Sequence, residues 1–338
     1  MGTGGENVAS NRSRSLVEPA LAPMLDLFPT IDLTEALLPA IRNRPPWVPV
    51  EPADRARTGV AERTLPGPAG APDVSARLYR PLDAAGPLPC ILHIHGGGFV
   101  AGRSADLEGA HLPLAADLRC CILSVDYRVA PETRFPGAVE DCYAALAWLM
   151  RQAGAEGIDP ARVGVMGESA GGGLAAALAL LARDRGEHRL AFQHLIYPML
   201  DDRTCVTPDP HPFTGEFVWT AQSNRFGWSA LLGGEPGGAG VSPYAAPARA
   251  GDLAGLPPAY IATGSLDLFL EEDIDYARRL MRAGVPVELH VYFGGFHAFN
   301  AWPASPIAAN ARRDSKDALA RAFGSYADPR PSAGTNMA

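Results

Sequence analysis

Positive charge in this chain comes almost entirely from arginine, because Lys316 is the only lysine among its 338 residues. The formal net charge is −8, and no block of like charges extends beyond a few residues. Nucleic-acid and anionic-membrane binding both require a concentrated basic patch, so the sequence argues against them. The partner expected from this charge pattern is a small neutral or cationic molecule, or another protein.

Cysteine is also scarce, and no two cysteines form a CxxC pair. Three of the five lie within or beside apolar runs, where a thiol packs as a small hydrophobic group. We interpret all of them as reduced and structural. The cysteines are Cys90, Cys120, Cys121, Cys142 and Cys205.

Long hydrophobic runs are missing as well. The longest purely apolar run covers residues 174–182, far below the ~20 residues that span a membrane. The first residues are polar and lack the apolar core of a signal peptide. We therefore expect no membrane association and a cytoplasmic location.

Both ends of the chain are rich in small and polar residues. Residues 1–15 and 327–338 contain little that could be buried, and we predict that they are disordered. Residues 16–44 instead have a helical pattern, with an apolar stripe that runs from Leu33 to Ile41 at i, i+3, i+4 spacing. Asp32 and Glu35 are placed as a capping box, and Pro39 predicts a kink or an early stop.

Eight strand-like runs follow, and the last six are mostly continuous apolar segments. Such segments are typical of strands that are buried on both faces of a mainly parallel sheet. Helix-like segments separate most of them, so we predict an open α/β sheet covered on both faces. The predicted strands are 60–65, 74–81, 89–95, 120–127, 162–166, 192–198, 258–265 and 285–293. The predicted helices are 138–152, 170–185, 271–283 and 304–323.

One interval, residues 201–258, interrupts this alternation. It is too long for an ordinary connection and it is rich in aromatic residues. We interpret it as an insertion that forms a lid near the site. Its aromatic residues are Phe213, Phe217, Trp219, Phe226 and Trp228.

Ser169 is the central residue of a G-x-S-x-G motif, between Gly167 and Gly171. The motif directly follows a predicted strand and directly precedes a predicted helix, which is the context of a nucleophile elbow. The turn is so tight that larger flanking side chains would collide with neighbouring segments. In such a turn the serine Oγ projects above the sheet, and the N–H of Ala170 can donate to an oxyanion. A glycine-rich turn with a serine N-cap is the alternative.

A serine nucleophile requires a base and an acid that orients the base. His297 follows the last predicted strand by a short glycine loop, at the carboxyl end where open α/β sheets place their sites. Asp267 follows the preceding strand, and it precedes His297 in the order Ser, Asp, His that this fold uses. Its neighbours Glu271, Glu272 and Asp273 are better interpreted as the acidic first turn of the next helix, where they favour the helix dipole.

A second oxyanion donor could come from His95-Gly96-Gly97-Gly98-Phe99, which follows an earlier strand. Three successive glycines allow the backbone to turn its N–H groups inward and to approach a substrate closely. A phosphate-binding loop or simple flexibility is the alternative. No GK[ST] sequence follows the glycines, and no ribose-binding acid is evident, so nucleotide binding is disfavoured.

Taken together, HGGGF, DYRVAPETRFPGAVEDCYAAL, GESAGGG, GSLDLF and GGFHAF resemble the bacterial hormone-sensitive-lipase-type (family IV) carboxylesterases. These motifs extend over residues 88–302. The resemblance implies the α/β-hydrolase fold, with a mostly parallel, doubly wound sheet of about eight strands and a helical cap. It implies that Ser169, Asp267 and His297 form a catalytic triad. The amides of Gly97, Gly98 and Ala170 would form the oxyanion hole.

The same resemblance divides the chain into a catalytic domain and a cap. Residues 56–200 and 259–326 would form the catalytic domain. The cap would combine the N-terminal helices, residues 16–55, with part of the insertion 201–258. Phe99, Phe217, Trp219 and Phe226 are expected to line an apolar acyl pocket.

Three residues depart from the common family pattern and bear on the subgroup and its substrate. Glu168 stands where Asp or Thr is more frequent, Gly173 where Asn is frequent, and Leu268 where Pro is frequent. Glu168 is interpreted as a carboxylate at the start of a helix, with a buried partner role near the turn as the alternative.

The function expected from these motifs is hydrolysis of short- to medium-chain carboxylic esters through an acyl-enzyme. It needs neither a metal nor an organic cofactor, and its partner is a small-molecule ester, with a homodimer as a family expectation. An amidase, lactonase or carbamate hydrolase would use the same groups. A non-catalytic small-molecule-binding protein of this fold is the minor alternative, because such a protein would be expected to lack part of the triad.

Overall fold

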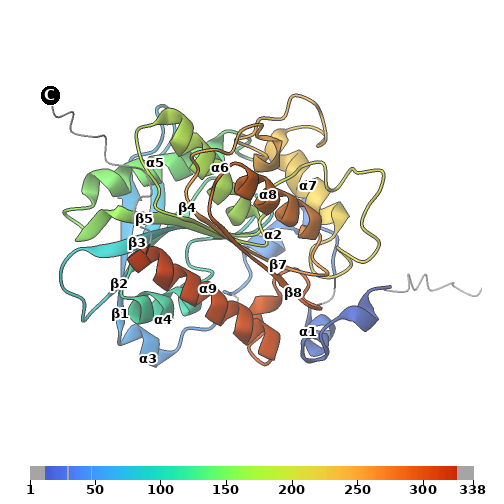
Figure 1. Ribbon diagram of the computed structural model, residues 1–338, viewed down its shortest axis with the longest axis horizontal. Coiled ribbons are helices and arrows are strands. Elements are labelled where there is room, and N and C mark those ends of the chain that lie inside the picture. Colours follow the sequence, from blue (N-terminus) through green and yellow to red (C-terminus); the bar gives the residue numbers. More distant parts are fainter. Residues whose placement is uncertain (1–11, 29, 47, 326–338) are drawn as a thin grey trace, which may run out of the picture.

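The computed structural model describes residues 12–28, 30–46 and 48–325, and they fold around one eight-stranded sheet with the strand order β1-β2-β4-β3-β5-β6-β7-β8 (Figure 1). Every predicted strand is present, with bounds that differ by a few residues. The strands are β1 Thr58–Leu65, β2 Val74–Pro81, β3 Leu88–Ile94, β4 Cys121–Asp126, β5 Ile158–Glu168, β6 Gln193–Ile196, β7 Ala259–Gly264 and β8 Val287–Tyr292.

The six strands from β3 to β8 are all parallel to one another, as their continuous apolar character predicts. β3 and β7 are buried along their whole length, whereas β8 forms one edge of the sheet and is half-exposed. At the other edge, β1 pairs antiparallel with β2, and β2 pairs antiparallel with β4. The predicted α/β fold with a mostly parallel sheet of about eight strands is confirmed.

Helices cover both faces of the sheet. They shield the strand side chains from solvent, and these side chains can therefore be apolar on both faces. In Figure 1, α5, α6 and α8 lie above the sheet, while α4 and α9 lie below it. The sequence interpretation missed α4 and α7. The helices are α1 Ala22–Leu27, α2 Leu38–Arg42, α3 Pro52–Arg55, α4 Glu108–Leu118, α5 Gly137–Gln152, α6 Ala170–Arg185, α7 Ala221–Leu232, α8 Leu270–Arg282 and α9 Pro306–Ser325.

The N-terminal segment is helical only in short pieces, which corrects the expected longer helices. It contains the turns η1 Arg14–Leu16, η2 Pro19–Leu21 and η3 Glu35–Leu37 together with α1 and α2. Asp32 and Glu35 form no capping box, because no side chain caps η3 and Asp32 accepts a hydrogen bond from Thr220 instead. Proline in the first turn of η2, α1 and α2 favours helix starts and interrupts any longer helix.

This segment contacts elements that lie far away in the sequence. Of the residues expected to be disordered at this end, Ser13 is buried and its hydroxyl donates to Glu216 of the insertion at 2.6 Å. Residues 1–11 and the predicted tail at 327–338 lie outside the described residues. Further along, Arg42 donates to the carbonyls of Val100 and Ala130, both at 2.8 Å. The segment therefore connects the insertion to the loop that follows β3.

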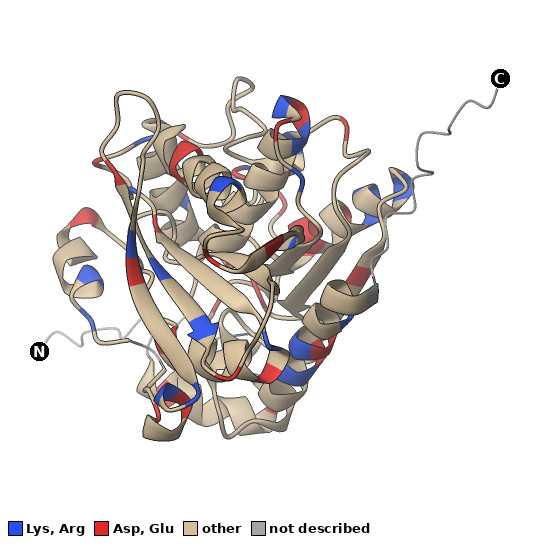
Figure 2. Ribbon diagram, turned by 90° about the vertical axis from the view of Figure 1, so that its left-hand side faces the viewer, with Lys and Arg blue, Asp and Glu red and all other residues tan. Residues whose placement is uncertain are grey.

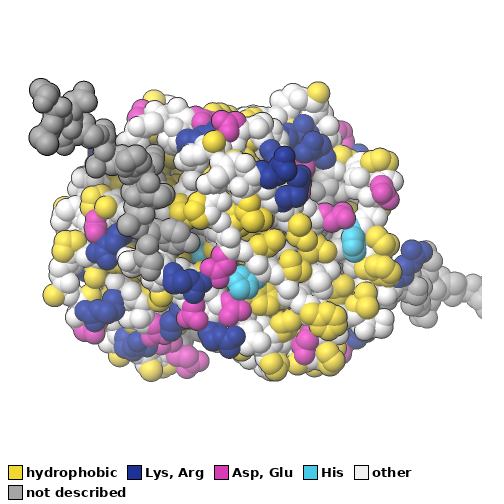
Figure 3. Space-filling model, viewed as in Figure 1, with side chains coloured by type: hydrophobic (Ala, Val, Ile, Leu, Met, Phe, Trp, Pro, Cys, Tyr) yellow, Lys and Arg dark blue, Asp and Glu magenta, His cyan; other side chains and the backbone are white. Residues whose placement is uncertain are grey.

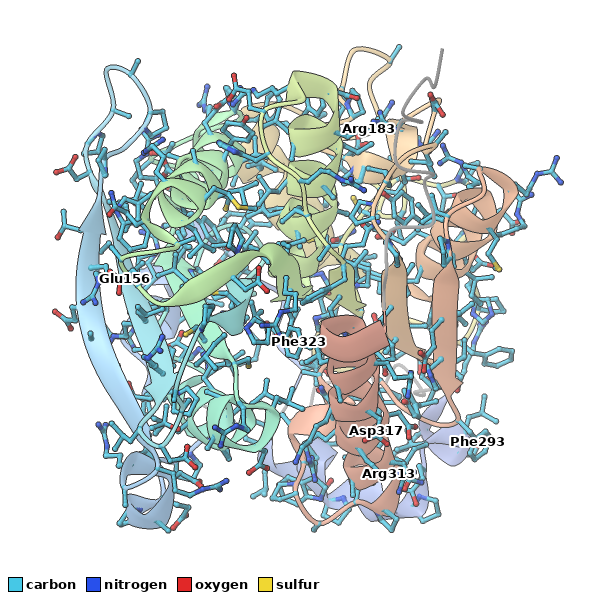
Figure 4. The ribbon with its side chains drawn as sticks, turned by 60° about the vertical axis from the view of Figure 1, so that its left-hand side comes forward. Glu156, Arg183, Phe293, Arg313, Asp317 and Phe323 are labelled. Carbon is cyan, nitrogen blue, oxygen red and sulfur yellow. The ribbon has the colours of Figure 1, made fainter. Side chains whose placement is uncertain are left out.

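Charged residues of both signs are interspersed on the surface. Figure 2 shows blue and red residues side by side along the edge strands and along α9. Several of them form ion pairs that connect elements, such as Arg63 with Glu156 at 2.8 Å and Lys316 with Asp117 at 2.7 Å. Figure 3 shows hydrophobic side chains gathered over the right half of the face that carries α8 and β8 in Figure 1. Phe293, just past β8, projects outward in Figure 4 and is 69% exposed.

Candidate active site

Ser169 lies in the turn between the end of β5 and the start of α6, as the G-x-S-x-G motif predicts. Its backbone has φ of 55° and ψ of −124°, a conformation that costs a non-glycine residue free energy. Its N–H donates to the carbonyl of Ile196 at 2.9 Å, and its carbonyl accepts from Met199 at 2.9 Å. The neighbouring strand therefore holds the serine in this strained turn.

The glycines on either side of Ser169 lie where the chain has no room for a side chain. A Cβ on Gly167 would lie 2.3 Å from the carbonyl oxygen of Gly171, and one on Gly171 would lie 2.0 Å from that of Ile94. Both contacts are with backbone atoms, which cannot rotate away. The two glycines therefore allow β3, β5 and α6 to meet at the serine.

His297 follows β8 and the Gly294-Gly295-Phe296 loop, and its ring reaches back to Ser169. Its Nε2 lies 2.9 Å from Ser169 Oγ, and its Nδ1 lies 2.9 Å from the nearer carboxylate oxygen of Asp267. The rings of Tyr197 and Phe269 stand edge-on to the imidazole, with centroids 4.8 and 5.3 Å away. The imidazole is thus fixed on both nitrogens and on its sides.

Asp267 lies in the turn between β7 and α8 and is completely buried. Besides His297, its carboxylate accepts from the N–H of Phe269 at 3.0 Å. The three residues come from the carboxyl ends of β5, β7 and β8, and the fold brings them into one hydrogen-bonded row. Such a row can move a proton from the serine to the imidazole while the carboxylate keeps the ring in one tautomer.

The glycine loop after β3 lies beside this row. Its backbone is in the left-handed region at Gly97 (φ 127°) and Gly98 (φ 61°), and Phe99 also has a positive φ. The Gly97 carbonyl accepts from Val100 and Ala101, so the N–H of Gly98, on the opposite side of the same trans peptide, points the other way. Ala170 is the first residue of α6, so its N–H has no acceptor within the helix.

The comparisons with known proteins agree with this geometry. A family model described as the alpha/beta hydrolase fold matches residues 91–301. The chain belongs to the α/β-hydrolase family. Esterase LipI of Mycobacterium tuberculosis is 35% identical to it over 81% of this chain and 85% of that protein. Carboxylesterase NlhH of the same species is 33% identical over 92% of this chain and 98% of that protein.

A solved structure named bacterial heroin esterase also matches this α/β hydrolase. The TM-score is 0.82 at 38% identity, over 91% of this chain and 98% of that one. The resemblance to the hormone-sensitive-lipase-type carboxylesterases is thereby confirmed.

Glu168 has a partner that corrects its interpretation as a helix-start carboxylate. Its side chain accepts a hydrogen bond from Nε2 of His93 on β3 at 2.9 Å. The other ring nitrogen of His93 lies 2.8 Å from the hydroxyl of Ser124 on β4. No pattern in the sequence pairs these residues, because the pairing depends on β4, β3 and β5 being neighbours in the sheet.

The four aromatic residues expected in a substrate pocket lie in different surroundings. Phe99 packs against Trp228 and Phe217 against Phe296, and both side chains are almost completely buried. Phe226 packs against the apolar cluster of the N-terminal segment and Val100. The ring of Trp219 lies beside His297, with ring centroids 6.1 Å apart. A Cβ on Gly98 would lie 2.3 Å from this indole.

The acidic residues that follow Asp267 do form the first turn of α8, but two of them are not solvated. Glu272 accepts from the N–H of Leu200 at 2.6 Å, and burial raises its pKa well above the usual value. Burial also raises the pKa of Asp273, helped by the negative charges of Glu272 and Asp267. Glu272 therefore connects α8 to the segment after β6, in addition to favouring the helix dipole.

Within the described part of the chain, no three His, Cys, Asp or Glu side chains cluster in a way that could hold a metal ion. None of the helices described there is both long and apolar enough to cross a membrane. The five cysteines are free thiols, and four of them are buried.

Proposed function

We propose that this α/β hydrolase is a serine carboxylesterase in which Ser169 is the nucleophile, His297 the base and acid, and Asp267 the orienting acid. The observation that carries the proposal is the unbroken row of hydrogen bonds from Ser169 Oγ through His297 to Asp267, with 2.9 Å at each step. The esterase relatives that cover most of the chain support the same reaction class.

The acylation step uses the two ends of this row. Ser169 Oγ bonds to the ester carbonyl carbon while its proton moves to Nε2 of His297. The imidazolium is stabilised by the carboxylate of Asp267. The tetrahedral intermediate then collapses, the bond to the alcohol oxygen breaks, and Nε2 returns the proton to the leaving alkoxide. The product of this half-reaction is an ester of Ser169.

Deacylation repeats these proton transfers with water. His297 removes a proton from water, and the water oxygen attacks the acyl carbon. When this second intermediate collapses, Ser169 Oγ leaves and recovers its proton from Nε2. The amides of Gly97, Gly98 and Ala170 would donate to the oxyanion in both half-reactions, and each donor is worth on the order of 3 kcal/mol in the transition state.

The substrate class follows from the surroundings of the serine. Ser169 and His297 are only 7% and 6% exposed, and the indole of Trp219 packs on Gly98 beside them. A site this enclosed favours small, uncharged esters, because a charged group would lose its hydration without a partner. We therefore infer that the substrates are esters of short- to medium-chain acids, with Trp219 limiting the length of the chain.

The decisive experiment compares the wild-type enzyme with Ser169→Ala. Wild type is offered p-nitrophenyl esters of increasing acyl length and a fluorophosphonate that labels active serines. We expect wild type to be labelled at Ser169 and to hydrolyse acetate and butyrate esters, whereas the variant loses on the order of a million-fold in turnover. Ser75→Ala, which changes an exposed serine on β2, is the control and should retain activity.

Wild type that is neither labelled nor active would contradict the proposal, and so would equal activity in Ser169→Ala. Faster hydrolysis of matched amides, lactones or carbamates than of esters would move the enzyme to another hydrolase class with the same residues. The cytoplasmic location and the homodimer stay predictions, and the mass of the protein in solution tests the second of these.

A further inference from the structure

Glu168 and His93 form a polar pair directly beneath the strained serine turn. The His93 side chain is only 1% exposed and that of Glu168 is 18% exposed, so the bond between them lies mostly inside the protein. The bond from His93 to Ser124 then extends the pair to β4. A row of side chains thus crosses three neighbouring strands and ends on the residue before Ser169.

The position of this pair in the sheet is unusual. The backbone pairing of β3 with β5 ends at Ile94 and Gly167. Beyond this point β3 becomes the glycine loop and β5 becomes the serine turn, and no ladder hydrogen bond joins them. The pair runs diagonally, since His93 lies opposite Met166 and reaches the residue two positions further along β5. It therefore connects the two strands where they separate into the site.

The two turns also touch through their backbones at this point. A Cβ on Gly96 would lie 2.8 Å from the carbonyl oxygen of Glu168 and 3.4 Å from the Cβ of Ser169. Any shift of Glu168 would change the distance between the serine and the glycine loop. Strained backbone conformations persist only where their surroundings hold them in place, and the His93 bond restrains the residue that enters the strained turn.

We propose that His93 and Glu168 are positioning residues, whose hydrogen bond sets the serine turn against the glycine loop and so aligns Ser169 with its oxyanion donors. This inference rests on the proposed function. The pair acts through Ser169 and does not touch the substrate. Because it aligns groups for the reaction, its loss should lower kcat and leave KM almost unchanged.

His111 packs against His93 without forming a hydrogen bond to it. Its ring stands edge-on to that of His93 with centroids 4.2 Å apart. Burial and the neighbouring His93 lower the pKa of His111 well below its usual value, so this ring stays neutral and packs as an aromatic group. The carboxylate to which His93 bonds is that of Glu168, directly before Ser169.

Four variants test the bond itself. Glu168→Ala removes the acceptor, and His93→Phe removes the donor while keeping a ring of similar size. Glu168→Gln keeps an acceptor oxygen without the charge, and His93→Gln keeps a donor toward Glu168. We expect the first two to lose about ten- to a hundredfold in kcat with KM within about twofold of wild type. The two glutamine variants should retain kcat within about threefold of wild type.

His194 provides a matched control on the neighbouring strand β6. It is also a buried strand histidine, and its Nε2 lies 2.8 Å from Ser315 on α9, away from the serine turn. His194→Phe should leave kcat unchanged. Thermal unfolding of every variant is recorded, and the loss of stability in Glu168→Ala should be no larger than that in His194→Phe.

The rate of fluorophosphonate labelling separates the two proposals. If wild type is not labelled, the proposed function fails. If wild type is labelled and Glu168→Ala is labelled equally fast, only the positioning role fails. If Glu168→Gln is as slow as Glu168→Ala, the charge matters rather than the hydrogen bond, and the proposal is overturned. It is overturned too if His194→Phe loses as much kcat as His93→Phe.

Discussion

The contact between Gly171 and β3 predicts a large effect from a single methyl group. In Gly171→Ala the new Cβ would lie 2.0 Å from the carbonyl oxygen of Ile94 and 2.5 Å from that of His95. Ordinary contact begins at 3.4 Å. The start of α6 and the end of β3 must therefore move apart by about 1.4 Å, because both atoms belong to backbone in a close-packed interior.

The displacement separates the two halves of the site. Ser169 and Ala170 move with α6, whereas Gly97 and Gly98 follow β3. A misplacement of about 1 Å in a catalytic site costs on the order of a hundredfold in rate, and overpacking of this kind destabilises a protein by about 1–3 kcal/mol. We expect kcat for p-nitrophenyl butyrate to fall about a hundredfold, with a lower Tm.

Gly154→Ala is the matched control, because a Cβ there meets no atom within 4 Å. Both variants are compared by steady-state kinetics, by fluorophosphonate labelling and by thermal unfolding. A Gly171→Ala enzyme with the kcat and Tm of the control would refute the view that steric contact with β3 fixes the serine turn. Loss of Tm alone, with full kcat, would show that the turn moves as one unit with the glycine loop.

Three further changes have distinct expected outcomes. Trp219→Ala removes the indole from Gly98 and should raise the kcat/KM ratio of octanoate to acetate esters about tenfold, since the space should bury about two more methylenes at about 0.8 kcal/mol each. An unchanged ratio in an acyl-length series would exclude Trp219 as the limit on chain length. Asp267→Asn should lower kcat on the order of ten-thousand-fold with little change in KM, because the amide favours the wrong tautomer of His297; a loss below tenfold would contradict its orienting role. The raised pKa of Asp273 means that the folded protein binds a proton that the unfolded chain releases above about pH 4, so the free energy of unfolding should fall as the pH rises through this window. Asp273→Asn should remove part of this fall, so its Tm should exceed that of wild type at pH 7 and match that of wild type near pH 3.5. If the variant and wild type had equal Tm values at pH 7 as well, the role assigned to Asp273 would be disproved.

Much of the sheet and the members of the candidate site could be predicted because the evidence for them is local. Apolar runs indicate buried strands, and the serine turn, the glycine loop and the histidine loop each follow such a run. The two missed helices lack this local evidence. Pro113 interrupts the sequence of α4, and α7 lies inside the interval that we interpreted as an insertion.

The partners of buried polar residues could not be predicted from local patterns. Glu168 meets His93 only because the sheet places β3 beside β5. Glu272 meets Leu200 only because α8 begins beneath the segment that follows β6. In the N-terminal segment the apolar stripe was visible, but prolines divide the helix into short pieces. Pairing across the fold decides such contacts, and the sequence carries no period that reveals it.

The packing of the N-terminal segment has a consequence for synthesis on the ribosome. Leu21 and Met24 share one apolar cluster with Phe296 and Phe299, on either side of His297. A chain is made from its N-terminus, so these early residues can contact Phe296 and Phe299 only after the last part of the chain has left the ribosome. The same late stretch brings the imidazole to Ser169. Full packing of the first helix and completion of the active site therefore both wait for the same late stretch of the chain.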